Sequence, residues 1–221
     1  MSKTAILLGA SGFTGALLLE QLIADDTYEK IKLFSRSSVH ETSIKVEEHL
    51  VDLLNLEASK DQFFGDVVFC CIGTTAAKTK DKKKYKSIDY GIPTAAAKLA
   101  KQNNISTFIV LSSMGADASS AVFYNKTKGE MEGAVLTQKI PHTFILRPSL
   151  IGGRRKEFRL GEKIGKVFMT AFNPFLTGRF EKYKIIPPET IVKCMTVLAS
   201  NTKNETIISS DKIVTIANSI K

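Results

Sequence analysis

A turn punctuated by glycines, set between an apolar run and a helical segment, constrains this chain of 221 residues most strongly. The apolar run covers residues 4–8, and the helical segment covers residues 13–24. Gly9 lets the chain turn off the strand, Gly12 lets an anion approach the backbone, and Gly15 lets the helix pack closely on the strand. A strand, a glycine turn and a helix in this order predict a phosphate-binding loop.

The start of the helix completes this loop. Its unpaired N–H groups and the positive end of its dipole point at the bound anion. We therefore expect the pyrophosphate of a dinucleotide to bind at Gly9, Ser11, Gly12, Phe13, Thr14 and Gly15.

Strand-length apolar runs alternate with helical segments along the first two thirds of the chain. Strands are predicted near 4–8, 31–35, 46–51, 66–72, 107–112 and 143–147, and helices near 13–24, 55–63, 87–103 and 121–138. Runs such as 66–72 lack alternation, as expected of strands buried on both faces. The pattern predicts an α/β fold with a doubly wound parallel sheet, the Rossmann fold, in a single domain over residues 1–221. Residues from about 150 to 221 would contribute the substrate side.

Composition limits the classes of function. The net charge of +9 favours anionic partners, among them a dinucleotide phosphate or a nucleic acid. No apolar run has the length of a membrane span. The three cysteines are odd in number, which indicates reduced thiols and a cytoplasmic location. The three histidines lack metal-ligand spacing, so no metal site is predicted.

The end of the second predicted strand bears on the choice of cofactor. An acidic residue at this place accepts hydrogen bonds from the ribose hydroxyls of NAD. Residues 33–38 contain no carboxylate, and Arg36 offers a forked donor that suits a 2′-phosphate, with Ser35 and Ser37 as further donors. NADP is therefore favoured over NAD. The alternative is that Arg36 is an ordinary solvated cation.

Two further strand ends lie at the same edge of the predicted sheet. Asp52 either accepts a hydrogen bond from the adenine amino group or caps the following helix, and the sequence leaves both open. Gly73, Thr74 and Thr75 follow the fourth strand, where the glycine would let the dinucleotide lie flat against the backbone.

A basic run covers residues 78–86, with one aromatic residue inside it. Basic runs in loops are usually solvated surface, and no motif of a nucleic-acid-binding fold lies nearby. Nucleic acid is therefore an unlikely partner.

Residues with hydride-transfer chemistry follow the fifth strand. Ser112 and Ser113 stand at its end, and Tyr124 and Lys128 lie four residues apart on the next helix, hence on one face. An ammonium near a phenol favours its ionised form, and such a tyrosine exchanges a proton with a carbonyl oxygen while a serine hydroxyl binds the same oxygen. Lys128 can also hold the hydroxyls of the nicotinamide ribose.

Together, the three glycines, Ser112 and Ser113, and Tyr124 with Lys128 resemble the short-chain dehydrogenase/reductase superfamily in its atypical branch. Segments 69–75, 111–117 and 124–130 are similar to the Tat-interacting-protein-like oxidoreductases. The resemblance implies Tyr124 as the acid/base, Lys128 as its partner and Ser113 as the donor to the substrate oxygen, with Ser112 as the fallback. It also implies that Arg147, after the sixth strand, borders the nicotinamide.

The rest of the chain carries weaker patterns. A basic cluster occupies residues 154–159, and an apolar helical segment at 161–172 with a break at 173–178 would form a lid or a substrate wall. A strand ending at Ile186, a helix over 191–199 and an edge strand near 205–208 are also predicted.

The sequence predicts an NADP-dependent oxidoreductase that moves hydride between the cofactor and a small carbonyl compound or alcohol. One alternative is an NADPH-binding regulatory or scaffold protein with little turnover, and another is an isomerase or epimerase that keeps its cofactor. The predicted oligomeric state is monomer or homodimer.

Overall fold

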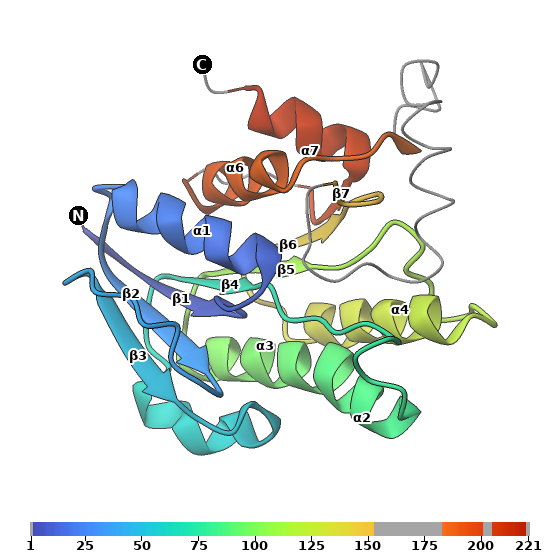
Figure 1. Cartoon of the computed structure of the whole chain (residues 1–221), viewed down its shortest axis with the longest axis horizontal. Helices are drawn as coiled ribbons and strands as arrows, with labels where there is room; N and C mark the ends of the chain where they lie inside the picture. The colour runs from blue at the N-terminus through green and yellow to red at the C-terminus, as the bar shows by residue number, and fades with distance from the viewer. Residues whose placement is uncertain (1, 153–182, 201–204, 220–221) are drawn as a thin grey trace.

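One parallel sheet of seven strands organises the molecule (Figure 1). The computed structural model describes residues 2–152, 183–200 and 205–219. The strands are β1 (Lys3–Leu8), β2 (Tyr28–Ser35), β3 (Val46–Leu50), β4 (Val67–Cys70), β5 (Thr107–Leu111), β6 (His142–Arg147) and β7 (Ile207–Ser209). Their order is β3-β2-β1-β4-β5-β6-β7, and each neighbouring pair runs parallel. The order reverses between β1 and β4, where ligands bind in open sheets of this kind.

Helices cover both faces of the sheet (Figure 1). On one face lie α1 (Phe13–Ala24), α6 (Pro188–Ser200) and α7 (Ser210–Ala217). On the other side are η1 (Leu53–Gln62), α2 (Lys82–Lys86), the π-helical turn η2 (Ser87–Gly91), α3 (Ile92–Gln102) and α4 (Phe123–Leu136). The predicted doubly wound parallel sheet is therefore confirmed.

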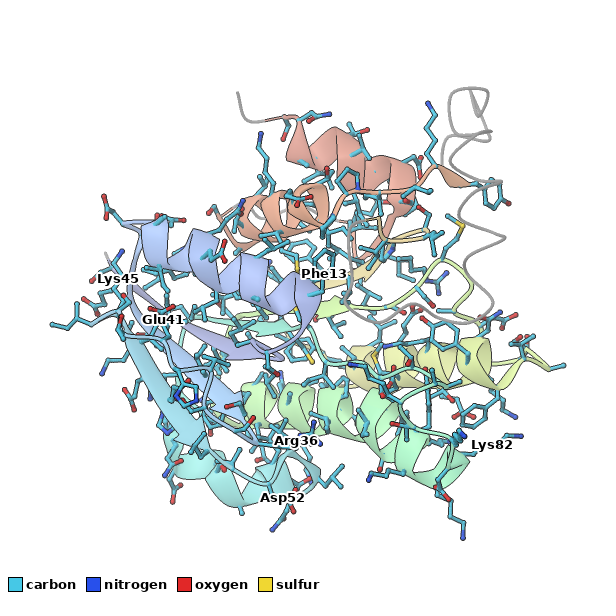
Figure 2. The ribbon with its side chains drawn as sticks, in the orientation of Figure 1. Phe13, Arg36, Glu41, Lys45, Asp52 and Lys82 are labelled. Carbon is cyan, nitrogen blue, oxygen red and sulfur yellow. The ribbon has the colours of Figure 1, made fainter. Side chains whose placement is uncertain are left out.

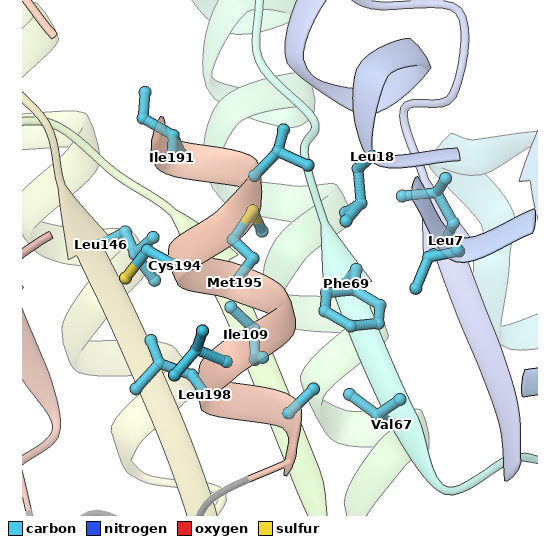
Figure 3. Packing of buried hydrophobic residues seen from close by; sticks show 14 of the residues in the cluster. Leu7, Leu18, Val67, Phe69, Ile109, Leu146, Ile191, Cys194, Met195 and Leu198 are labelled. Carbon is cyan, nitrogen blue, oxygen red and sulfur yellow. The ribbon is translucent and has the colours of Figure 1, made fainter. Parts of the chain in front are cut away.

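Successive side chains of the central strands point alternately into two apolar layers, one on each face of the sheet. Leu7, Phe69, Ile109 and Leu146 pack on the face of α1 and α6, where Figure 3 shows Met195 of α6 among them. Their strand neighbours point into the second layer, against η1, α3 and α4. Because both faces are buried, these strands show the uninterrupted apolar runs seen in the sequence.

Element boundaries differ from prediction where polar residues enter a strand. β2 begins at Tyr28 rather than at residue 31, because Tyr28 and Lys30 already pair with β1 although Lys30 is exposed. β4 ends at Cys70, although the Cys71 amide still donates to the Leu8 carbonyl at 2.9 Å.

The strand predicted to end at Ile186 is wrong. Ile186 forms only an isolated parallel bridge to Ile151, outside the seven-stranded sheet. The residue after it is Pro187, which lacks an N–H for a ladder, and Pro188 already begins α6. The predicted edge strand near 205–208 is β7, which pairs with β6.

A helix replaces the predicted loop in the basic run. The Asp81 carboxylate accepts from the Lys84 amide at 2.7 Å and caps α2, which leads through η2 into α3. The segments predicted at 154–159, 161–172 and 173–178 lie outside the described residues. Within the described ranges, no helix has the length and hydrophobicity that a membrane span requires.

Candidate active site

Close backbone packing in the loop after β1 demands glycine. Gly9 has φ +91°, and a Cβ there would lie 2.9 Å from the Cys71 carbonyl carbon. A Cβ on Gly15 would lie 2.1 Å from the Gly9 carbonyl oxygen, so helix α1 can touch the turn only with glycine at this position. Gly12 is less crowded, with its closest contact at 3.2 Å. The residues therefore fit a dinucleotide pyrophosphate, with Gly12 as the open position.

Helix α1 begins next to this loop with a glycine at its N-cap. Gly12 is the N-cap residue, and it has no side chain that could cap the helix. Ser11 and Gly12 are exposed, whereas Thr14 and Gly15 are buried. The positive end of the helix dipole lies at this exposed turn, and it attracts anions. Figure 2 shows Phe13 at the start of α1, above the sheet.

Arg36 stands directly after β2 with an exposed side chain (Figure 2). Among the described residues it forms no ion pair, so its guanidinium is available to an external anion. Ser37 is exposed as well. Ser35 is buried, and its hydroxyl donates to the Ser37 carbonyl at 2.9 Å. Ser35 thus shapes the loop, while Arg36 and Ser37 face solvent.

Asp52 comes two residues after β3, the strand beside β2. Its carboxylate accepts from the Leu54 amide at 3.0 Å and caps η1. Of the two roles left open by the sequence, the helix cap is the one that the contacts describe. Because Asp52 is exposed, its second oxygen still faces solvent.

The loop after β4 lies against a buried ion pair. A Cβ on Gly73 would be 3.5 Å from Asp89 Oδ1 and 3.9 Å from Lys128 Nζ. The Thr74 amide donates to Asp89 Oδ2 at 2.7 Å. The Thr74 hydroxyl pairs with Thr79, and the Thr75 hydroxyl accepts from a backbone amide. The Thr74 hydroxyl is thus occupied by Thr79, whereas the Gly73 backbone is exposed and the Thr75 hydroxyl can still donate its proton.

The two serines after β5 have different environments. The Ser112 hydroxyl donates to the Glu132 carboxylate at 2.5 Å and is buried. The Ser113 Oγ is also buried, and it has no hydrogen-bond partner among the described residues. A buried hydroxyl without a partner is rare and calls for a ligand atom or water. Ser113 is therefore the serine that is free to bind a substrate oxygen.

Lys128 and Tyr124 share a face of α4. The Lys128 ammonium lies 3.1 Å from Asp89 Oδ1, and both side chains are almost fully buried. Burial alone would lower the pKa of Lys128, but Asp89 and the nearby Tyr124 outweigh it and raise the pKa. Lys128 therefore stays charged. Tyr124 is half-buried, and its ring meets the Tyr85 ring edge-on at 6.5 Å between centroids.

Arg147 is bound within the protein. Its Nη2 donates to Glu132 Oε2 at 2.5 Å and its Nε donates to Glu132 Oε1 at 3.0 Å. Glu132 thus joins α4 to the ends of β5 and β6 through Ser112 and Arg147. The resemblance implies that Arg147 borders the nicotinamide. In the structure the guanidinium binds Glu132, and Arg147 is the last residue of β6.

Two lysines of the basic run contact other side chains of the protein. Lys86 pairs with Glu130 at 2.6 Å, and the Lys82 ammonium lies 5.5 Å from the centre of the Phe123 ring. Tyr85, the aromatic residue of the run, is buried and gives no exposed stacking surface for bases.

The cysteines and acidic residues do not assemble a metal centre in the described part of the chain, where no group of three or more potential ligands occurs. Cys70 and Cys71 are free thiols. Burial raises the pKa of Cys70 to about 11 and raises that of Cys71 further, so both remain protonated.

Sequence reasoning missed Asp89 and Glu132. Glu132 follows Tyr124 and Lys128 at the same four-residue interval, so it lies on the same side of α4, and that spacing was a usable signal. Asp89 lies in a π-helical turn, a deviation that frequently marks functional sites. No sequence pattern distinguishes that turn from an ordinary helix.

Comparison with known families agrees with this geometry. A family model described as NAD(P)H-binding matches residues 9–168. Protein HTATIP2 of Rattus norvegicus is 32% identical over 198 residues, which cover 88% of this chain and 80% of that protein. "Protein FMP52, mitochondrial" of Candida albicans is 34% identical over 169 residues, which cover 74% of each chain.

Solved structures share the fold at low identity. A UDP-glucose 4-epimerase of Thermotoga maritima, solved with UDP-glucose, has a TM-score of 0.70 at 13% identity and covers 97% of this chain and 81% of its own. The Bordetella bronchiseptica enzyme WbmG, in complex with NAD, has a TM-score of 0.69 at 10% identity and covers 98% and 77%. The chain thus belongs to the NAD(P)H-binding family, as an atypical short-chain dehydrogenase/reductase with a Rossmann fold.

Proposed function

We propose that this chain is an NADP-dependent oxidoreductase that transfers hydride between the nicotinamide and a small carbonyl compound or alcohol. The observation that carries the proposal is the buried, unpartnered hydroxyl of Ser113 at the carboxyl end of β5. It stands at the sheet edge that also holds the glycine loop, and Tyr124 with Lys128 follows on α4. The family membership supports the binding of a nicotinamide dinucleotide.

The bound cofactor would supply or accept the hydride at the carbonyl carbon. In reduction, the Tyr124 hydroxyl gives its proton to the carbonyl oxygen, and Ser113 donates a hydrogen bond to the same oxygen. Lys128 keeps its charge because Asp89 holds it, so it can stabilise the tyrosinate that remains. The product is an alcohol, and Tyr124 recovers its proton from water.

Arg36 supports the choice of NADP. Its exposed guanidinium follows β2, where no carboxylate accepts from ribose hydroxyls. A charge-assisted contact of this kind is worth about 1.5–3 kcal/mol, or about ten- to hundredfold in affinity.

We further propose that residues 1–221 act as one domain and that the chain from about residue 150 lines the substrate side. The Ser149 hydroxyl donates to the Lys184 carbonyl, and Ile151 bridges Ile186. These contacts attach residues 184–186 to the chain just after β6. The oligomeric state, monomer or homodimer, stays a prediction.

A cytoplasmic location also stays part of the proposal. It rests on the odd number of cysteines in the sequence, which indicates reduced thiols. The fungal relatives carry "mitochondrial" in their names. Fractionation of cells that express the native chain decides between the two compartments.

To test this function, NADPH consumption by the purified protein is measured with a panel of aldehydes, ketones and quinones. The Tyr124→Phe variant should abolish turnover and leave the dissociation constant of NADPH unchanged within about twofold. Tyr28→Phe is the matched control, since its hydroxyl is buried and unpartnered at the start of β2, and activity should persist. Turnover that survives in Tyr124→Phe would refute the proposed acid. NADPH binding without turnover by the unaltered protein would favour the regulatory alternative.

A further inference from the structure

The loop that carries Arg36 is fixed by a carboxylate from the neighbouring strand. Glu48 on β3 accepts a hydrogen bond from the Ser38 hydroxyl at 2.5 Å and one from the Val39 amide at 2.8 Å. Each carboxylate oxygen therefore holds one point of the loop. All three residues are half-buried.

We call the two hydrogen bonds from Ser38 and Val39 to Glu48 the clamp. Local hydrogen bonds order the chain on both sides of it. The Ser38 hydroxyl accepts from the His40 amide at 2.9 Å, and His40 has φ +57°. On the other side of Arg36, the Ser35 hydroxyl donates to the Ser37 carbonyl at 2.9 Å. The Ser35 carbonyl also accepts from the Val51 amide, which ties the end of β2 to the chain after β3. Arg36 is thus exposed on a backbone that is held before and after it.

We propose that Glu48 is a positioning residue for cofactor choice, which holds the Arg36 loop in the shape that receives the 2′-phosphate. The inference rests on the proposed role of Arg36. A loop ordered before binding loses less conformational entropy when the phosphate arrives, so the clamp favours the phosphorylated cofactor specifically.

The charge of Glu48 makes this proposal distinguishable from a purely electrostatic effect. A carboxylate near a bound phosphate repels it, so removal of the charge alone would tighten binding. Removal of the clamp would weaken binding. The two effects have opposite signs, and a Glu48 variant reports which one dominates.

The experiment measures dissociation constants of 2′,5′-ADP and 5′-AMP by calorimetry, because these probes differ only in the 2′-phosphate. Glu48→Ala should weaken 2′,5′-ADP binding about tenfold and leave 5′-AMP binding within about twofold. Glu47→Ala is the control, since Glu47 is on the same strand but pairs with Lys30 at 3.2 Å and contacts His49. It should change neither constant.

Two further variants separate the clamp from folding and from Arg36 itself. Ser38→Ala removes one of the two contacts, the hydrogen bond from the Ser38 hydroxyl, and keeps the carboxylate with its bond from the Val39 amide. It should reproduce part of the selective loss even where Glu48→Ala folds poorly. In an Arg36→Ala background, the added Glu48→Ala change should have almost no effect on the 2′,5′-ADP constant, because the clamp acts through Arg36.

The outcomes are distinct. Tighter 2′,5′-ADP binding by Glu48→Ala, or equal loss for both probes, would overturn the positioning role. If the unaltered protein binds both probes equally, the proposed NADP preference fails, and the role of Glu48 falls with it. That second failure appears in the unaltered protein, whereas failure of the clamp alone appears only in the variants.

Discussion

The ammonium of Lys128 lies 3.1 Å from the carboxylate of Asp89, and both groups are almost fully buried. The pair joins α4 to the π-helical turn before α3 and lies against the Gly73 backbone. It keeps a positive charge at the site without solvent to support it. The pair therefore serves both folding and the proposed chemistry.

Removal of one partner should be far more harmful than removal of both. Asp89→Ala leaves the Lys128 ammonium buried alone, which should cost about 3–5 kcal/mol in the free energy of unfolding. The double variant Asp89→Ala with Lys128→Met removes both charges, so it should cost less than Asp89→Ala alone. Urea denaturation measures all of these, and strict additivity would contradict the buried ion pair.

The two serines after β5 give a matched test of structure against chemistry. Ser112→Ala removes a buried hydrogen bond to Glu132 and should cost about 1.5–3 kcal/mol of stability. Ser113→Ala removes an unpartnered hydroxyl, so stability should hold while turnover of a carbonyl probe falls about a hundredfold. Thermal unfolding and steady-state kinetics on both variants check this. A larger loss of stability in Ser113→Ala than in Ser112→Ala would contradict the assignment.

How far the sequence predicts the site depends on the range of the interactions involved. The glycine loop and the spacing of Tyr124 and Lys128 are local, so they could be predicted. The choice between Ser112 and Ser113 depends on Glu132, twenty positions away, whose carboxylate takes the Ser112 hydroxyl. Such pairing is invisible until the chain folds.

The fold follows the same division. Continuous apolar runs predicted the central strands, because both faces of those strands are buried. The first three residues of β2, 28–30, include two charged residues, so the predicted strand begins three residues too late. Asp89, in the π-helical turn, binds Lys128 and the Thr74 amide, both of which are distant in the sequence, so no local pattern predicts its place in the site.

The glycine loop predicts contrasting effects for two glycine substitutions. Gly15→Ala would place a methyl group 2.1 Å from the Gly9 carbonyl oxygen, so it should cost about 1–3 kcal/mol and abolish NADPH binding. Gly133→Ala, within α4, meets nothing within 4 Å and should stabilise the helix by up to about 1 kcal/mol. Thermal unfolding with and without NADPH compares the two. Normal NADPH binding by Gly15→Ala would refute the close packing of α1 on the turn.

Stability should fall at alkaline pH, in part because of Cys70. Burial raises its pKa from 9.0 to about 11, so the unfolded chain loses this proton at lower pH than the folded chain. Its contribution is complete below pH 9 and is lost as pH rises to about 11, at up to about 1.4 kcal/mol per pH unit. Cys70→Ala should therefore flatten that decline, as urea denaturation at several pH values will measure. An unchanged slope would contradict the burial of the thiol.

The most direct measurement is a side-by-side titration of the purified protein with NADPH and NADH, followed by nicotinamide fluorescence. The account predicts tight NADPH binding, weaker NADH binding by about ten- to hundredfold, and loss of that difference in Arg36→Ala. Equal affinity for the two cofactors, or equal loss of both in Arg36→Ala, would contradict NADP dependence through Arg36.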